Sequence, residues 1–98
     1  MIFNWFDANE ADKFGVFLAE LLIERTPVDD AIGKRSVTKK HEAMLHQLGQ
    51  HVARFKAEHK LNMYKKAKLG NAFKWKLREK GYDAEYVDQM TNWLMFKL

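Results

Sequence analysis

The chain has 98 residues, a formal net charge of +4 and no cysteine. The missing cysteine excludes a disulfide framework and a thiolate metal site, and it suits the reducing cytoplasm in which we expect the protein to work. Apolar residues make up 47% of the chain, enough for one domain with a single modest core. Because proline occurs once and glycine five times, long stretches lack helix breakers, and we predict an all-α domain over residues 1–98.

No segment of the sequence predicts targeting or membrane insertion. The apolar stretch Met1–Phe6 has no basic residues before it and is followed by acidic ones, which is the reverse of a signal peptide. No apolar run approaches the roughly 18 residues that a membrane-spanning helix needs. We therefore expect no membrane span, and we expect the N-terminal aromatic residues to pack on the core.

The most apolar run, residues 14–23, predicts the first helix, which we place at residues 8–25. At about 100° per residue, one broad apolar face of this helix contains Phe14, Phe17, Leu18, Leu21 and Leu22. A second apolar strip has two small residues four positions apart and consists of Gly15, Val16, Ala19 and Ile23. This strip fits either burial inside a bundle or close contact with a second copy of the chain.

Residues 26–80 combine a short turn with a long helical stretch. Thr26 and Pro27 have the pattern of a helix start and predict a short helical turn near residues 27–32. Farther on, apolar residues recur at helical spacing, first as Met44, Leu45, Leu48, Val52 and Phe55 and then as Leu69, Phe73 and Leu77. One unbroken helix over residues 37–80 would be about 66 Å long, too long for a domain of this size. We therefore predict helices over residues 37–60 and 63–80, with a break at Asn62 or at Gly70–Asn71.

The end of the chain predicts a tight turn and a last helix. Gly81 can close a helix in the left-handed conformation, and Tyr82 can then pack back on Leu77. Asp83 has the position of an N-cap for a helix over residues 84–96. The predicted fold is a compact bundle of about four helices, in which the first packs against the Met44–Phe55 stripe and the last helix.

The sequence contains no catalytic or metal-binding pattern. His41 and His46 cannot form the zinc site of a helical metalloprotease, because that site needs a spacing of four residues and a spacing of five turns them about 140° apart. His51 and His59 do not repair this geometry. The sequence also lacks a glycine-rich phosphate loop, a nucleophile elbow and a cysteine nucleophile. We therefore expect a protein that is not an enzyme, with no metal, no cofactor and no small-molecule substrate.

Positive charge is concentrated in the middle of the chain. Residues 34–80 contain fourteen Lys and Arg and three Asp and Glu, a net charge of +11, whereas residues 1–33 carry −5 and residues 81–98 carry −2. These cations fit either a solvated helix surface or a nucleic-acid surface, with Tyr64 and Trp75 available for base stacking. The candidate nucleic-acid surface consists of Lys34, Arg35, Lys39, Lys40, Lys65, Lys66, Lys68, Lys74, Trp75, Lys76, Arg78 and Lys80.

The sequence leaves two functional hypotheses. The first is a non-enzymatic protein-interaction module, which binds a partner protein or self-associates through Gly15, Val16, Ala19 and Ile23. The alternative is a nucleic-acid-binding protein that uses the basic segment 34–80. Trp75 bears on the alternative, since it is either a core residue or an exposed ring that can stack on bases.

Overall fold

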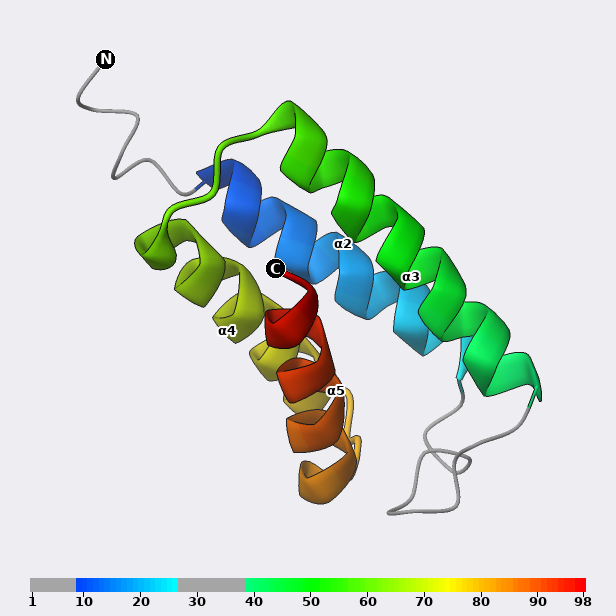
Figure 1. Cartoon of the computed structure of the whole chain (residues 1–98). Coiled ribbons are helices and arrows are strands. Elements are labelled where there is room, and N and C mark those ends of the chain that lie inside the picture. Colours follow the sequence, from blue (N-terminus) through cyan, green and yellow to red (C-terminus); the bar gives the residue numbers. More distant parts are fainter. Residues whose placement is uncertain (1–8, 27–38) are drawn as a thin grey trace.

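The structure, a computed structural model, describes residues 9–26 and 39–98 of the chain. With the labels of Figure 1, these residues form the helices α2 (Asn9–Arg25), α3 (Lys39–Glu58), α4 (Met63–Glu79) and α5 (Ala84–Lys97). The predicted all-α bundle of four helices is therefore confirmed, with helix ends within two residues of the predicted ones. The short turn predicted near residues 27–32 and the N-terminal residues predicted to pack on the core lie outside the described residues.

Helix α2 packs most extensively against α4, and the two helices run in the same direction (Figure 1). Helix α3 returns antiparallel along another side of α2, and α5 returns along α4. The sequence predicted the Met44–Phe55 stripe and the last helix as the partners of the first helix. That prediction missed α4, which is the main partner, and the contact of α2 with α3 is narrower.

A close approach of two backbones explains why α4 is the main partner of α2. A Cβ atom added to Gly15 would overlap the carbonyl oxygen of Leu69 and would lie 3.0 Å from the Cβ of Ala72. Ala19, one turn farther along α2, is fully buried. Because these two positions have almost no side chain, α2 and α4 can approach more closely than helices with larger residues at the contact.

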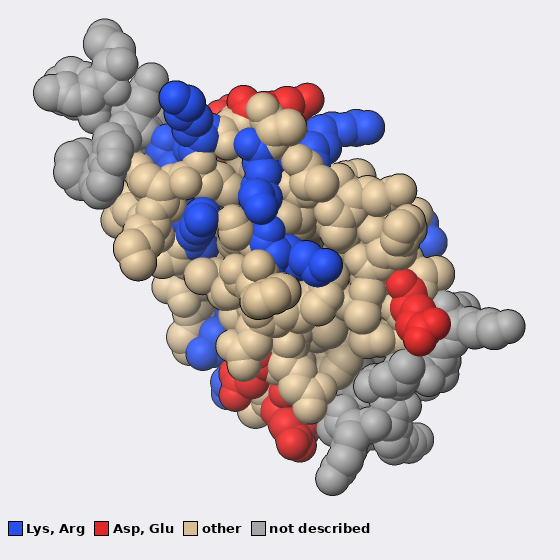
Figure 2. Space-filling model, viewed as in Figure 1, with Lys and Arg blue, Asp and Glu red and all other residues tan. Residues whose placement is uncertain are grey.

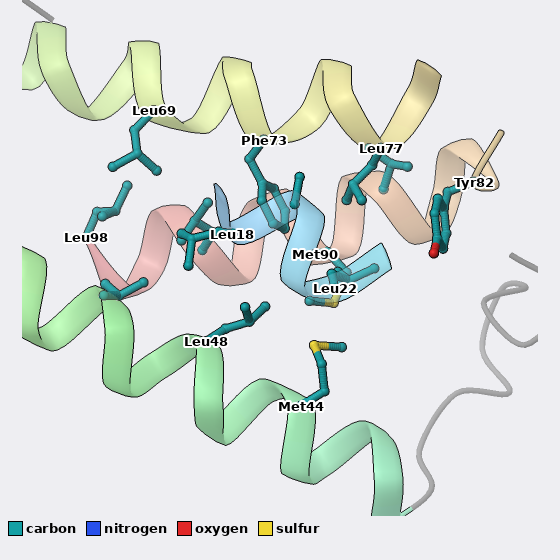
Figure 3. Packing of buried hydrophobic residues seen from close by; sticks show 14 of the residues in the cluster. Leu18, Leu22, Met44, Leu48, Leu69, Phe73, Leu77, Tyr82, Met90 and Leu98 are labelled. Atoms are coloured by element: carbon teal, nitrogen blue, oxygen red, sulfur yellow. The ribbon is translucent and has the colours of Figure 1, made fainter. Parts of the chain in front are cut away.

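The core lies where the apolar faces of all four described helices meet. Figure 3 shows Leu69, Phe73 and Leu77 pointing from α4 toward α2 and α5, while Met44 and Leu48 approach from α3. The fully buried large side chains are Leu18, Leu22, Met44, Leu48, Val52, Leu69, Phe73, Leu77, Tyr86, Val87 and Leu94. Both predicted apolar stripes of the middle segment, in α3 and in α4, thus contribute to one core.

A row of stacked rings forms the contact between α2 and α3. Phe14 and Phe55 stack with their centroids 4.1 Å apart and their planes nearly parallel, and His59 stacks on Phe55 at 4.2 Å. One turn away, the ring of Phe17 meets His51 edge-on at 5.2 Å. The sequence predicted Phe17 as part of the core face, but 40% of this residue is exposed, so it covers the rim of the core instead.

The break in the long helical stretch occurs at Asn62, the first of the two predicted positions. The side-chain Oδ1 of Asn62 accepts a hydrogen bond of 2.8 Å from the backbone nitrogen of Lys65, as an N-cap does. Gly70 and Asn71 lie inside α4. Gly70 makes room for α5 there, since an added Cβ would lie 2.5 Å from the Sδ of Met95.

The predicted turn between the last two helices is confirmed. Gly81 has φ +92°, its nitrogen donates to the carbonyl oxygen of Arg78 at 3.0 Å, and the nitrogen of Tyr82 donates to that of Leu77 at 3.3 Å. This pair of hydrogen bonds is the Schellman motif. Asp83 then caps α5, because its Oδ2 accepts from the nitrogen of Tyr86 at 3.3 Å.

Two buried tyrosines tie this turn to the other helices. The hydroxyl of Tyr82 donates to the carbonyl oxygen of Thr26 just after α2. The hydroxyl of Tyr86 and the Nε2 of His41 in α3 form a hydrogen bond of 2.8 Å. Burial, with a smaller contribution from Tyr82, raises the pKa of Tyr86 to about 12, and burial lowers the pKa of His41.

Candidate nucleic-acid interface

Helix α4 carries seven of the twelve residues predicted for a nucleic-acid surface, and an eighth, Lys80, is its C-cap. Lys34 and Arg35 lie outside the described residues. Lys39 and Lys40 form the first turn of α3, and the structure does not describe their side chains. Any surface built from the described part of the chain is therefore a surface of α4 and its neighbours.

The eight residues do not share one face of α4. Lys68, Trp75, Arg78 and Lys80 are exposed, whereas the half-buried ones are Lys65, Lys66, Lys74 and Lys76. Because Leu69, Phe73 and Leu77 point into the core, the opposite side of the helix faces solvent. Lys68 and Arg78, the exposed cations of α4, lie on this outer side.

The outer side of α4 has a regular stripe of aromatic and polar residues, which we call the α4 stripe. It contains Tyr64, Lys68, Asn71, Trp75 and Arg78. Their spacing of three or four residues aligns them along the helix axis over about 21 Å. All five residues are exposed. The stripe therefore presents two rings, an amide and two cations to solvent in one line.

Trp75 is the most distinctive residue of the α4 stripe. It is 59% exposed, although tryptophan is highly buried on average in folded proteins. The Nζ of Lys74 lies 5.9 Å from the centroid of its ring, a cation–π distance. Tyr64, three turns before Trp75, is 42% exposed. The sequence left open whether Trp75 is a core or a surface residue, and the structure places it on the surface.

A shallow groove with a volume of about 420 Å³ runs beside Trp75, between α4 and α2. Two acidic residues, Asp12 and Glu79, line it together with Val16, Ala72 and Lys76. At 100° per residue, Lys74 and Arg78 lie on the other flank of the stripe, away from α2. The groove side therefore combines the carboxylates of Asp12 and Glu79 with the lysines Lys68 and Lys76, whereas Lys74 and Arg78 are both cations.

The four histidines have separate surroundings. His41 binds Tyr86, His51 packs against Phe17, and the Nδ1 of His59 lies 3.4 Å from a carboxylate oxygen of Glu10. His46 is exposed on α3. Within residues 9–26 and 39–98, no group of three or more His, Asp or Glu is arranged to hold a metal ion.

The predicted self-association strip is divided between the core and the surface. Gly15 and Ala19 are buried against α4, so the two small residues serve the fold of the single chain. Val16 is half-buried beside the groove at Trp75, and Ile23 is half-buried against the core. Of the two arrangements that the sequence allowed for this strip, the structure shows burial inside the bundle for its two small members.

The sequence indicated Asn71, the middle residue of the α4 stripe, only as part of a candidate helix break and not as a surface residue. Its position three residues after Lys68 and four before Trp75 is a signal that could have identified it. Sequence reasoning also missed a groove between α3 and α5, lined by Gly49 and Trp93 among others. That groove depends on how two separate helices are placed, and no local pattern encodes such a placement.

Comparisons with family models, with curated proteins and with solved structures find no match to this chain. Among the described helices, none combines the length and the apolar character needed to cross a membrane.

Proposed function

We propose that the protein binds nucleic acid through the α4 stripe. The observation that carries this proposal is the exposed ring of Trp75, with Lys74 over it and with Lys68 and Arg78 on the same outer side of the helix. Aromatic rings beside cations are the usual means by which proteins hold nucleic acids without reading their sequence. We keep the prediction of a cytoplasmic protein, which rests on the absence of cysteine.

The charges around Trp75 support one path for the phosphates. On the side toward α2, the carboxylates of Asp12 and Glu79 offset the charges of Lys68 and Lys76, so that side attracts phosphates less. Lys74 and Arg78 attract them on the opposite flank. A base stacked on Trp75 then has its sugar-phosphate backbone along that flank. A single strand suits this arrangement better than a duplex, because its bases are free to stack on a protein ring.

Fluorescence anisotropy with a labelled single-stranded oligonucleotide tests the proposal. The test variant Lys68→Gln, Lys74→Gln, Arg78→Gln removes three cations from the outer side of α4. The control variant Arg25→Gln, Arg54→Gln, Lys60→Gln removes three exposed cations located elsewhere, so both have the same net charge. The test variant should bind more weakly than the wild type. The slope of log K against log [salt] should become shallower by about 2, since each lost phosphate contact contributes about 0.7 to it. The control variant should keep the affinity and the salt dependence of the wild type.

Two results would count against the proposal. One is the absence of binding at about 100 μM protein in low salt, the weak end of non-specific nucleic-acid affinity. The other is an equal loss of affinity in the test and control variants, because net charge alone would then account for the binding.

Exposed apolar side chains support a second candidate function, a protein-interaction module. Phe96 is 88% exposed and Met63 is 84% exposed, at the end of α5 and the start of α4. Residues of these types are enriched at protein interfaces. Light scattering across a dilution series of the wild type and of Phe96→Ala tests self-association. If the wild type and Phe96→Ala both remain monomeric, self-association is excluded and the partner must be a different protein.

A further inference from the structure

We propose that the groove between α3 and α5 is a docking site for an acidic amphipathic helix of a partner protein. This proposal deepens the second candidate function above. It does not depend on nucleic-acid binding, because its residues lie on helices other than α4. Three features of the molecule support it: the shape of the groove, a glycine that contacts nothing in the described part of the fold, and the charge around the groove.

The groove exists because α3 and α5 make only a narrow contact with each other. Its volume is about 490 Å³. Val52 is buried at its floor, and Trp93 of α5 is half-buried there. Both helices face the viewer in Figure 1. An apolar floor open to solvent is the usual feature of a groove that receives a helix.

Gly49 is the residue that points to a close partner. It lies in the middle of α3, where glycine is less favourable than alanine, and a Cβ added to it would have no atom within 4 Å. The other three described glycines have a role in the fold: Gly15 contacts α4, Gly70 contacts Met95, and Gly81 has positive φ. Gly49 has none among the residues that the structure describes. A missing side chain beside a groove allows the backbone of a bound helix to come close.

The dimensions of the groove fit a helix. Leu45, Gly49, Val52 and Lys56 line it from α3 at spacings of four, three and four residues. They span about 16 Å, the length of three helical turns. A partner helix that places an apolar residue at every third or fourth position can therefore cover the groove along its whole length.

The charges around the groove select an acidic partner. The Nζ of Lys56 donates to the carbonyl oxygen of Lys97 at 2.9 Å, and the Nζ of Lys97 lies 5.8 Å from the ring centroid of Trp93. No Asp or Glu is among the described residues that line the groove. In Figure 2, Lys and Arg side chains occupy the middle of this face, and Asp and Glu lie toward its rims. Glutamates beside the apolar stripe of the bound helix would complement these lysines.

A pair of synthetic peptides tests the proposal. The first is a capped fifteen-residue helix with a leucine stripe and flanking glutamates, and its twin has lysine at each glutamate position. Each is titrated into uniformly 15N-labelled full-length protein. The glutamate peptide should shift the amide of Gly49 and the indole N–H of Trp93, and should leave the amides of Gly15 and Gly81 in place. The lysine twin should bind more weakly by at least about tenfold.

Substitutions at Gly49 give a matched pair of variants. Gly49→Phe fills the groove and should weaken the glutamate peptide by at least about tenfold. Gly49→Ala adds one methyl group, which holds the backbone of the bound helix away, so it should weaken the glutamate peptide but less than Gly49→Phe does, with a circular dichroism spectrum that confirms the fold. In a second variant, Lys56→Glu with Lys97→Glu, the preference should reverse toward the lysine twin.

Equal binding of the glutamate peptide to the wild type and to Gly49→Phe overturns this site. Equal binding of the two peptides overturns the proposed acidic chemistry. Failure of both peptides to bind at about 1 mM, the limit of a weak interaction, overturns the docking proposal altogether. The second candidate function fails separately, when Phe96→Ala and the wild type are both monomeric and no partner protein is found.

Discussion

Gly15 of α2 lies directly against the backbone of Leu69 in α4, so close that a Cβ atom at Gly15 would overlap the carbonyl oxygen of Leu69. A backbone atom cannot move aside as the end of a flexible side chain can. The contact therefore fixes how closely α2 and α4 approach, and it aligns Leu18 and Leu22 with the buried residues of α4 (Figure 3).

Gly15→Ala should destabilise the protein by about 1–3 kcal/mol, because the added methyl group forces the two helices apart. Gly49→Ala is the matched control, since it adds the same group to α3 in open space. It should stabilise the protein by about 0.5–1 kcal/mol through helix propensity. Urea denaturation of both variants checks this prediction. If both variants gain stability, the close contact at Leu69 does not limit the packing.

Leu48→Ala and Phe17→Ala should differ in their effect on stability, although the sequence predicted both residues as core. Leu48 is fully buried, and its truncation should cost about 2–5 kcal/mol through the lost contacts and the cavity. Phe17 is 40% exposed at the rim, so its truncation should cost less. Thermal denaturation of the two variants compares them. A larger loss for Phe17→Ala would contradict its position at the rim.

Stability should fall above pH 10 because of Tyr86. Burial raises the pKa of this hydroxyl to about 12, from an ordinary value of 10.0. Between these two pH values an unfolded tyrosine loses its proton while the folded one keeps it, so the free energy of unfolding decreases as pH rises. Tyr86→Phe cannot ionise. Urea midpoints measured from pH 8 to 11.5 should therefore fall more steeply for the wild type than for Tyr86→Phe, and equal slopes would contradict the prediction.

The helices and their ends could be predicted because their signals are local. Asn62 and Asp83 cap α4 and α5 with their own side chains. The turn at Gly81 ends α4 through hydrogen bonds that reach back no more than five positions in sequence. Such contacts involve neighbours in sequence, and residue type alone indicates them. The chain therefore shows most of its secondary structure before any packing is known.

The pairing of helices could not be predicted in the same way. The first helix has two apolar strips, and the sequence does not say which one meets which partner. Once Gly15 and Ala19 lie against α4, the centre of the buried face moves toward them. Phe17 lies about 100° from Leu18 on the helix and is thereby left at the rim. The sequence also could not place Trp75, because a tryptophan between two lysines fits either the core or the surface.

Replacement of Trp75 by alanine is the measurement that tests nucleic-acid binding by the α4 stripe most directly. Phe96→Ala is the control, because it removes another exposed aromatic ring from a different helix. Both variants should unfold at nearly the temperature of the wild type, since neither ring is part of the core. Trp75→Ala should lose about 1–3 kcal/mol of binding free energy for a single-stranded oligonucleotide in anisotropy titrations, and Phe96→Ala should lose none. Wild-type affinity in Trp75→Ala, or an equal loss in both variants, would contradict the account.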